Sequence, residues 1–377
     1  MKEEVIYLIN LDWGWIKQRP HFIVKEIGER FNVRVFYQRR YRRGSLQHNN
    51  ENTKEIKIYP IYVLPRIGEY PRLSRINTFI RNKKFKKAIK RFQPKVIITT
   101  YPDQIRAIPE NYKGVVVYDC MDDHVSFIKN AYLKRLIFKE EKELLNRADC
   151  IFATSNKLIE NINEKYDFKD NNRITLVRNG YDGEIISTLS IEKSEFYKIC
   201  YFGTVSEWFD FDIVMKSLND FSNIQYYIIG PCDREVPLHE RIHYLGTIEH
   251  SKLYDTVSSM DCFIMPFVIN DIVLAVDPVK LYEYINFNKN IISIYYPEIE
   301  RFKDFVHFYT NYDSYKNVIE GLLVDNSLSY SSEERISFLK DNSWKRRGET
   351  IILELAKRMD INAKKKNCDN STICREN

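Results

Sequence analysis

The chain lacks the features of a secreted, zinc-binding or membrane-spanning protein. Its seven cysteines are scattered and form no CxxC pair, which argues against a disulfide framework and against a zinc site. No apolar run approaches the roughly 20 residues that a transmembrane helix needs. The N-terminus, with two acidic residues before a short apolar run, does not resemble a signal peptide. These absences predict a cytoplasmic location.

Acidic residues are scarce between residues 31 and 100, where 18 Lys and Arg face three Asp and Glu. Residues 1–150 carry a net charge of +14, whereas the remainder carries −8. Much of the excess lies in the runs 39–43 and 83–92, and the second places Phe85, Ile89 and Phe92 on one helical face. A basic amphipathic helix can bind an anionic membrane surface or phosphates. Alternatively, the three apolar residues pack on a sheet and the lysines are solvated.

The hydrophobic pattern alternates short β-branched runs with longer amphipathic segments, which is typical of α/β units around a parallel sheet. The expected strands are 5–10, 33–37, 57–63, 95–99, 114–118, 150–154, 174–177, 199–203, 224–230, 243–246, 262–267, 290–294 and 305–309. The expected helices are 18–31, 74–93, 130–147, 156–165, 210–219, 250–258, 278–287, 313–324 and 332–358.

This pattern predicts two Rossmann-like, doubly wound α/β domains that face one another across a cleft. The first spans residues 1–187 and the second 188–340, with a polar linker near 187–198. A helix at 341–362 could return to the N-terminal domain, and residues 363–377 form a polar tail that we expect to be disordered.

The segment Asp277–Tyr284 predicts a phosphate-binding helix start. Asp277 suits an N-cap and Pro278 the first helical position. Lys280 and Glu283 are three residues apart, so that one helix face presents a cation for phosphate and a carboxylate for hydroxyls. A capped surface helix with an ion pair is the alternative.

Several motifs recur in an order that resembles the GT-B glycosyltransferases, especially the family 4-like bacterial enzymes of surface polysaccharide assembly. In the second half they are Gly203, Ile229-Gly230-Pro231, Met265-Pro266-Phe267 and the Asp277–Tyr284 block. In the first half, Trp15-Ile16-Lys17-Gln18-Arg19-Pro20-His21 is similar to the WxxRPxH motif of that family, and 118–123 and 177–182 match further landmarks. The resemblance covers about residues 5–300 and implies the GT-B fold.

The resemblance also implies a donor site for a nucleotide-sugar, with a UDP-sugar as the default and with neither a cofactor nor a metal ion. Lys280 would contact the diphosphate and Glu283 the ribose hydroxyls. Gly203 would allow the donor to approach the backbone, and the turns at Gly230-Pro231 and Pro266-Phe267 would border the base and the sugar. Asp277 and Pro278 open the helix at this site.

The chain departs from the retaining members of the family, whose ExxxxxxxE pattern has Ala275 at the first glutamate here. An inverting reaction would need a general base. The candidates follow the strand that ends at Tyr118: Asp119, Asp122, Asp123 and His124, with Asp12 as a further one. Each aspartate could instead form a turn or cap a helix.

The acceptor would be contacted by residues near the first strand and the first helix, namely Asp12, Trp13, Arg19 and His21. His21 could equally be a structural histidine. The leading hypothesis is a cytoplasmic glycosyltransferase, peripheral at the inner face of the membrane, that adds sugar to a glycan or lipid-linked acceptor. The alternatives are a UDP-sugar epimerase, a nucleic-acid-binding protein that uses the basic N-terminal domain, and a catalytically silent sensor; no nucleic-acid-binding module is recognisable.

Overall fold

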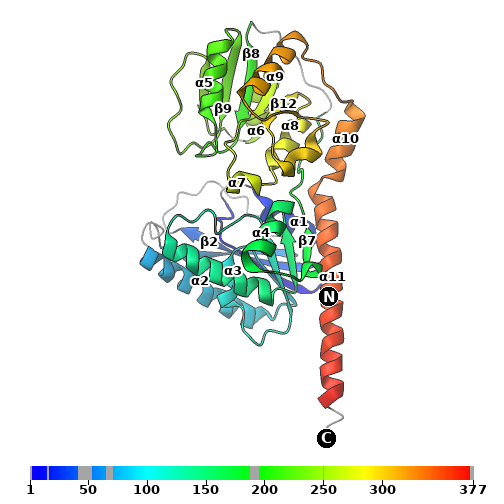
Figure 1. The fold of residues 1–377 in the computed structure, drawn as a ribbon. Helices are drawn as coiled ribbons and strands as arrows, with labels where there is room; N and C mark the ends of the chain where they lie inside the picture. Colours follow the sequence, from blue (N-terminus) through cyan, green and yellow to red (C-terminus); the bar gives the residue numbers. More distant parts are fainter. Residues whose placement is uncertain are drawn as a thin grey trace. The chain divides into compact units, whose positions relative to one another are not determined.

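Figure 1 shows a computed structural model, which describes residues 2–14, 17–40, 53–64, 71–186, 195–248 and 250–373. The chain forms two compact units. Unit 1 comprises Met1–Asn179 and Trp344–Asn377, and unit 2 comprises Gly180–Ser343. The boundary therefore lies earlier in the chain than the expected 187/188. Trp15, residues 41–43 of the first basic run and residues 187–194 of the expected linker lie outside the described residues.

Unit 1 is built on a seven-stranded parallel sheet of order β3-β2-β1-β4-β5-β6-β7. The strands are β1 (Glu4–Ile9), β2 (Asn32–Arg40), β3 (Ile56–Val63), β4 (Val96–Thr99), β5 (Val115–Cys120), β6 (Cys150–Ala153) and β7 (Ile174–Leu176). The helices are α1 (Arg19–Gly28), α2 (Pro71–Phe92), η2 (Pro102–Ala107), α3 (Ala131–Arg147), α4 (Asn156–Tyr166), η3 (Asn171–Arg173) and α11 (Trp344–Ile373). The order reverses between β1 and β4, which are hydrogen-bonded neighbours.

The apolar stripe of α2 faces the core of unit 1. Phe85 and Ile89 are buried, and the Phe92 ring lies 6.0 Å from that of Tyr59. The lysines between them are exposed. The apolar residues of this basic segment therefore pack on the sheet and its outer face is cationic, while the binding of a membrane surface or of phosphates by this face stays a prediction.

Helix α11 completes the core of unit 1 from the far end of the chain. Trp344 stacks on Phe22 with ring centroids 5.0 Å apart, and Ile351 and Leu355 are buried in the same cluster as Ile27 of α1. The helix continues to Ile373, where a disordered tail from 363 was expected. Residues 374–377 lie outside the described part of the chain.

Unit 2 has a six-stranded parallel sheet of order β10-β9-β8-β11-β12-β13. Its strands are β8 (Tyr197–Phe202), β9 (Ile224–Ile229), β10 (Ile242–Gly246), β11 (Cys262–Met265), β12 (Asn290–Ile294) and β13 (His307–Tyr309). Its helices are α5 (Phe211–Asp220), α6 (His250–Ser258), α7 (Asp271–Leu274), α8 (Val279–Asn286), η4 (Pro297–Phe302), α9 (Tyr312–Val324) and α10 (Ser332–Asp341).

Both sheets thus follow the doubly wound pattern, with the reversal of strand order at β1/β4 in unit 1 and at β8/β11 in unit 2. This confirms the prediction of two Rossmann-like domains. In such sheets, ligands bind beyond the carboxyl ends of the strands at the reversal. Among the described residues, no helix is both long and apolar enough to cross a membrane.

Candidate functional site

Two glycines shape the loops that follow β8 and β9 in unit 2. Gly203 has a φ of +153° and Gly230 a φ of +133°, which L side chains rarely adopt. A Cβ on Gly230 would lie 2.0 Å from the carbonyl oxygen of Gly203, so the two loops touch through bare backbone. The Gly203 N–H also donates to Ile229 O at 2.8 Å. The site at the strand reversal therefore has a floor of close-packed main chain.

Lys280 lies directly over this floor. Its Cε would be 1.8 Å from a Cβ on Gly203, and the residue stands in the first turn of α8. Burial lowers the pKa of Lys280, and the negative charge of Glu283 partly opposes this shift. In the part of the chain that the structure describes, no carboxylate lies within ion-pair distance of the Lys280 ammonium. A half-buried cation beside a helix N-terminus is suited to an anionic ligand.

Glu283 lies one helical turn after Lys280 and is partly exposed. Burial raises the pKa of the Tyr181 hydroxyl, and the negative charge of Glu283 raises it further. The Glu283 carboxylate therefore interacts electrostatically with both Tyr181 and Lys280. An ionised carboxylate only accepts hydrogen bonds, and it therefore fits a pair of hydroxyl groups.

Asp277 does not cap α8, contrary to the sequence-based expectation. The structure places Pro278 at the N-cap, and the buried Asp277 carboxylate forms an ion pair with Arg301 of η4. Arg301 also donates to the Tyr282 hydroxyl at 2.9 Å. The Arg301 guanidinium, which lies later in the chain, neutralises the Asp277 carboxylate. This ion pair connects η4 to the start of α8. Asp277 thus lies at the expected site but serves there as the counter-ion of Arg301.

The turns at Pro231 and Pro266-Phe267 lie beside the glycine loops. Pro231 O accepts from Val205 N and Pro266 O from Asp210 N, each at 2.8 Å. Phe267 pairs with Phe209 and its ring lies 6.2 Å from that of Tyr201. These contacts bring the loops after β8, β9 and β11 together, so the structure gathers Gly203, Gly230, Pro231, Pro266, Phe267 and Lys280 at one edge of the sheet.

In unit 1, Arg19 and Asp119 form a buried ion pair rather than a ligand site. The Arg19 Nη2–Asp119 Oδ1 distance is 2.8 Å, and neither side chain is more than 4% exposed. The Tyr7 hydroxyl donates to Asp119 at 2.7 Å, and Arg19 also donates to Val177 O. These bonds hold α1, β1, β5 and the chain after β7 together. The geometry therefore favours structural roles for Asp119 and Arg19.

Asp123 is also held by neighbouring side chains. It forms an ion pair with Lys165 and accepts hydrogen bonds from Ser126 Oγ at 2.8 Å and Asn161 Nδ2 at 3.1 Å. The residue is buried. These contacts are to Oδ2, and Oδ1 accepts from Ser126 N at 3.3 Å, so Asp123 joins the loop after β5 to α4.

Asp122 differs from its two neighbours. Burial raises the pKa of its carboxyl group, while the charges of His124 and Arg19 lower it. Within the described residues, no donor forms a hydrogen bond with its carboxylate. His124 Nε2 lies 3.1 Å from Thr100 O. Asp122 thus differs from Asp119 and Asp123, whose carboxylates accept hydrogen bonds from neighbouring side chains, and its role as a base stays a prediction.

Asp12 and Trp13 follow β1, and His21 in the first turn of α1 contacts Trp13. Asp12 Oδ1 accepts from Gly14 N at 3.2 Å, which makes a turn. His21 Nε2 lies 2.7 Å from Trp13 O, and the two rings are tilted by 33° with centroids 4.0 Å apart. His21 also bonds to Gln18 at the start of α1. These contacts assign a structural role to His21, whereas Asp12 remains partly exposed.

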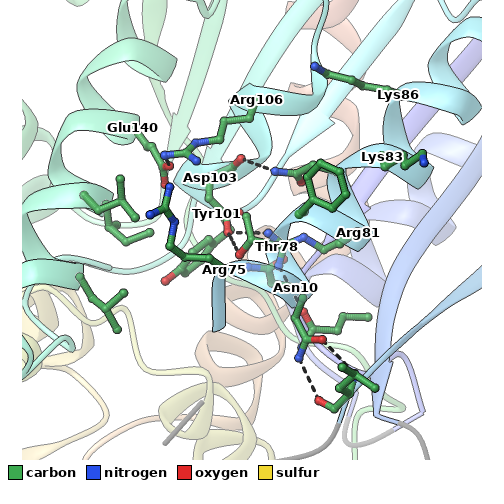
Figure 2. Close-up of a pocket in the computed structure, with 18 of the residues that line it drawn as sticks. Asn10, Arg75, Thr78, Arg81, Lys83, Lys86, Tyr101, Asp103, Arg106 and Glu140 are labelled. Atoms are coloured by element: carbon green, nitrogen blue, oxygen red, sulfur yellow. Dashed lines mark hydrogen bonds and ion pairs between the residues drawn. The ribbon is translucent and has the colours of Figure 1, made fainter. Parts of the chain in front are cut away.

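The sequence-based reasoning missed a pocket in unit 1. Figure 2 shows this pocket, which has a volume of about 720 Å³ and is lined by α2, α3, η2 and the ends of β1 and β2. It lies beyond the β1/β4 reversal, because Asn10 and Tyr101 follow these two strands and line it. The polar sequence Tyr101-Pro102-Asp103 directly after a predicted strand was the available signal.

Within the described residues, no three His, Cys, Asp or Glu side chains gather to hold a metal ion.

The model of the family described as Glycosyltransferase Family 4 matches residues 23–184. No curated protein sequence matches the chain significantly. Solved structures of other proteins resemble the chain over nearly its whole length, and three of them serve as examples. The first is the lipopolysaccharide outer core galactosyltransferase WaaB in its apo form, with a TM-score of 0.64 and 12% identity over 93% of this chain and 99% of that chain. The second is sucrose-phosphate synthase from Thermosynechococcus elongatus, with a TM-score of 0.67 and 13% identity over 94% of this chain and 98% of that chain. The third is Anabaena HepE in complex with UDP and glucose, with a TM-score of 0.66 and 12% identity over 94% of this chain and 99% of that chain.

Proposed function

We propose that this chain, a family 4-like member of the GT-B glycosyltransferases, moves a sugar from a UDP-sugar to a glycan or lipid-linked acceptor in the assembly of a surface polysaccharide. The observation that carries the proposal is the half-buried ammonium of Lys280, which lies over Gly203 at the start of α8 without an ion-pair partner in the described part of the chain.

The donor diphosphate would lie between Lys280 and the first turn of α8. The first N–H groups of a helix have no intrahelical acceptors, and the helix dipole favours negative charge there. Together with the Lys280 ammonium they would offset the charge that develops on the leaving UDP when the bond between the sugar and the phosphate oxygen breaks. No metal ion is needed in this assignment. Glu283, one turn later, would accept hydrogen bonds from the ribose hydroxyls.

UDP is the nucleotide that we assign to the donor. One structurally similar protein has been solved in complex with UDP and glucose, and another is a galactosyltransferase. In this proposal the carboxylate of Glu283 would bind the ribose, and the loops at Gly230-Pro231 and Pro266-Phe267 would border the base and the sugar.

On the acceptor side, Asp122 would take the proton from the attacking hydroxyl. Its raised pKa and its unoccupied carboxylate fit this role, and Ala275 stands where retaining members have their first glutamate. The exposed lysines of α2 would attract an anionic membrane surface or the phosphates of a lipid-linked acceptor. The enzyme would then work at the inner face of the membrane.

Calorimetry with UDP tests the donor site. We expect the full chain to bind UDP, and Lys280→Ala and Glu283→Ala each to weaken binding by about 1.5–3 kcal/mol, because each removes a charge-assisted hydrogen bond. Lys303→Ala is the matched control, since Lys303 is an exposed lysine of the same unit. Wild-type affinity in both site variants would refute the donor site.

Incubation with UDP-sugars alone tests the reaction. A glycosyltransferase without acceptor gives at most slow hydrolysis to free UDP and sugar. Formation of an epimeric UDP-sugar in this mixture would assign the chain to the epimerases instead, although the same UDP contacts would be present.

A further inference from the structure

The pocket of unit 1, which we call the α2–α3 pocket, has a polar floor. Arg81 and Asp103 form a buried ion pair there, Arg81 donates to Gln38 Oε1 at 3.2 Å, and Thr78 donates to Asp103 at 3.3 Å. Arg81 Nε, Asp103 Oδ1 and Asn82 Oδ1 are buried and have no hydrogen-bond partner among the described residues. Because unpaired buried polar atoms are rare, such a floor is suited to a ligand that brings both donors and acceptors.

The rim of the pocket is cationic. Arg75, Arg106, Lys83 and Lys86 line it, and Figure 2 shows Arg75 and Arg106 extending toward Glu140. Arg106 forms an ion pair with Glu140 and is still 41% exposed. Lys83 and Lys86 are exposed and have no ion-pair partner in the described part of the chain. With four cations against one paired glutamate, the rim favours an anion.

One wall of the pocket is apolar. Leu133, Leu136 and Ile137 of α3 line it, and Leu64 and Phe79 line its mouth although they are 47% and 67% exposed. Asn77 holds Leu64 in place through two backbone hydrogen bonds of 2.9 Å. Exposed apolar side chains that continue a concave apolar wall indicate a binding surface for hydrocarbon.

We propose that the α2–α3 pocket binds a lipid phosphate, with the phosphate at the Lys83/Lys86 rim and the hydrocarbon chain along the wall of Leu133, Leu136 and Ile137. This inference rests on the proposed function in one respect, since it assigns the bound amphiphile to the acceptor. A neutral glycan would not need the cationic rim, and a free inorganic anion would not need the apolar wall. The polar side chains of the floor would then form hydrogen bonds with the hydroxyls of a sugar that is attached to the lipid phosphate.

Farnesyl phosphate, a water-soluble lipid phosphate, is the probe for this pocket. In calorimetry with the full chain, we expect Lys83→Gln/Lys86→Gln to weaken its binding about 10- to 30-fold, because two charge contacts are lost. Lys84→Gln/Lys87→Gln changes the charge of the same helix by the same amount outside the pocket and should leave the affinity within about twofold of wild type.

Two further measurements test the hydrocarbon part. Leu136→Asn should weaken farnesyl phosphate binding, whereas Leu353→Asn, on the exposed side of α11, should not. Farnesol and inorganic phosphate should each bind at least about tenfold more weakly than farnesyl phosphate. Equal effects of the two lysine pairs, or equal affinity for inorganic phosphate, would overturn the proposal, since they indicate a diffuse basic surface or a simple anion site.

UDP binding, measured on the same preparations, separates this inference from the proposed function. If UDP binds and farnesyl phosphate does not, the α2–α3 pocket is wrongly assigned and the donor site stands. If farnesyl phosphate binds with the expected dependence on Lys83 and Lys86 and UDP does not, the lipid-phosphate site stands and the glycosyltransferase proposal fails.

Discussion

The side chain of Lys280 crosses the Cα of Gly203 so closely that a methyl group on the glycine would lie 1.8 Å from Lys280 Cε and 2.8 Å from its Nζ. The two residues come from separate segments, one from the loop after β8 and the other from α8. The absence of a side chain at residue 203 is therefore what permits the cation to lie over the backbone at the edge of the sheet.

Gly203→Ala should displace the Lys280 ammonium and strain the backbone, because φ is +153° at this residue. We expect UDP affinity to fall more than about tenfold, comparable to the loss in Lys280→Ala. Gly321→Ala is the control, since Gly321 lies in α9 and an added Cβ meets nothing within 4 Å. Calorimetry with UDP measures both, and undiminished affinity in Gly203→Ala would contradict the contact.

Asp122→Asn should abolish turnover and spare donor binding. Asparagine keeps the shape of the side chain but cannot accept a proton, so we expect the rate of sugar transfer to fall about 10²- to 10⁴-fold. Because burial raises the pKa of Asp122, wild-type activity should be lost on the acid side at a higher pH than an ordinary aspartate would give. UDP release in the presence of acceptor measures this, with the exposed Asp167→Asn as control. Full activity in Asp122→Asn would exclude it as the base.

Asp119→Ala should destabilise unit 1 strongly. It leaves the Arg19 guanidinium buried without its counter-ion and removes the acceptor of the Tyr7 hydroxyl. We expect a loss of about 3–5 kcal/mol in the free energy of unfolding. Glu160→Ala breaks the exposed Lys157–Glu160 pair and should cost no more than about 1 kcal/mol. Denaturant unfolding compares them, and similar losses would argue against a structural role for the Arg19–Asp119 pair.

Glu140 makes stability depend on pH. Burial and the charge of Asp103 raise its pKa from 4.5 to about 7, so the folded chain holds a proton that the unfolded chain has already released between these values. The free energy of unfolding should therefore fall as pH rises from about 4.5 to 7, by about 1–3 kcal/mol from this group. Glu140→Gln should remove this component and be more stable than wild type at pH 8. Parallel pH profiles of the two proteins would contradict the assignment.

The alternation of β-branched runs with amphipathic segments was sufficient to predict the elements of both sheets. The run of β-branched valines Val115–Val117 is buried and forms the first half of β5. The stretch 332–358 shows the limit of this reasoning. It was expected to be a single helix, but the chain breaks between α10 and α11 at Asn342-Ser343, where it leaves one unit for the other.

Side-chain partners were harder to predict than backbone elements. The local sequence of Asp277 favoured an N-cap, but Arg301 lies 24 residues later and forms an ion pair with it. Nothing in the neighbourhood of either residue indicates this contact. Likewise Asp119, Asp122 and Asp123 are nearly adjacent and chemically alike, and only the positions of Arg19 and Lys165 in the folded chain distinguish them.

Because α11 supplies Trp344, Ile351 and Leu355 to the core of unit 1, the first domain to be synthesised is the last to be completed. A ribosome must translate all of unit 2 before these three side chains reach their places beside α1. Premature termination anywhere within Gly180–Ser343 would therefore leave the apolar face of α1 uncovered, and a chain truncated after the second sheet would lose part of the core of the first domain. Expression of unit 1 alone would require the α11 segment to be joined directly to Asn179.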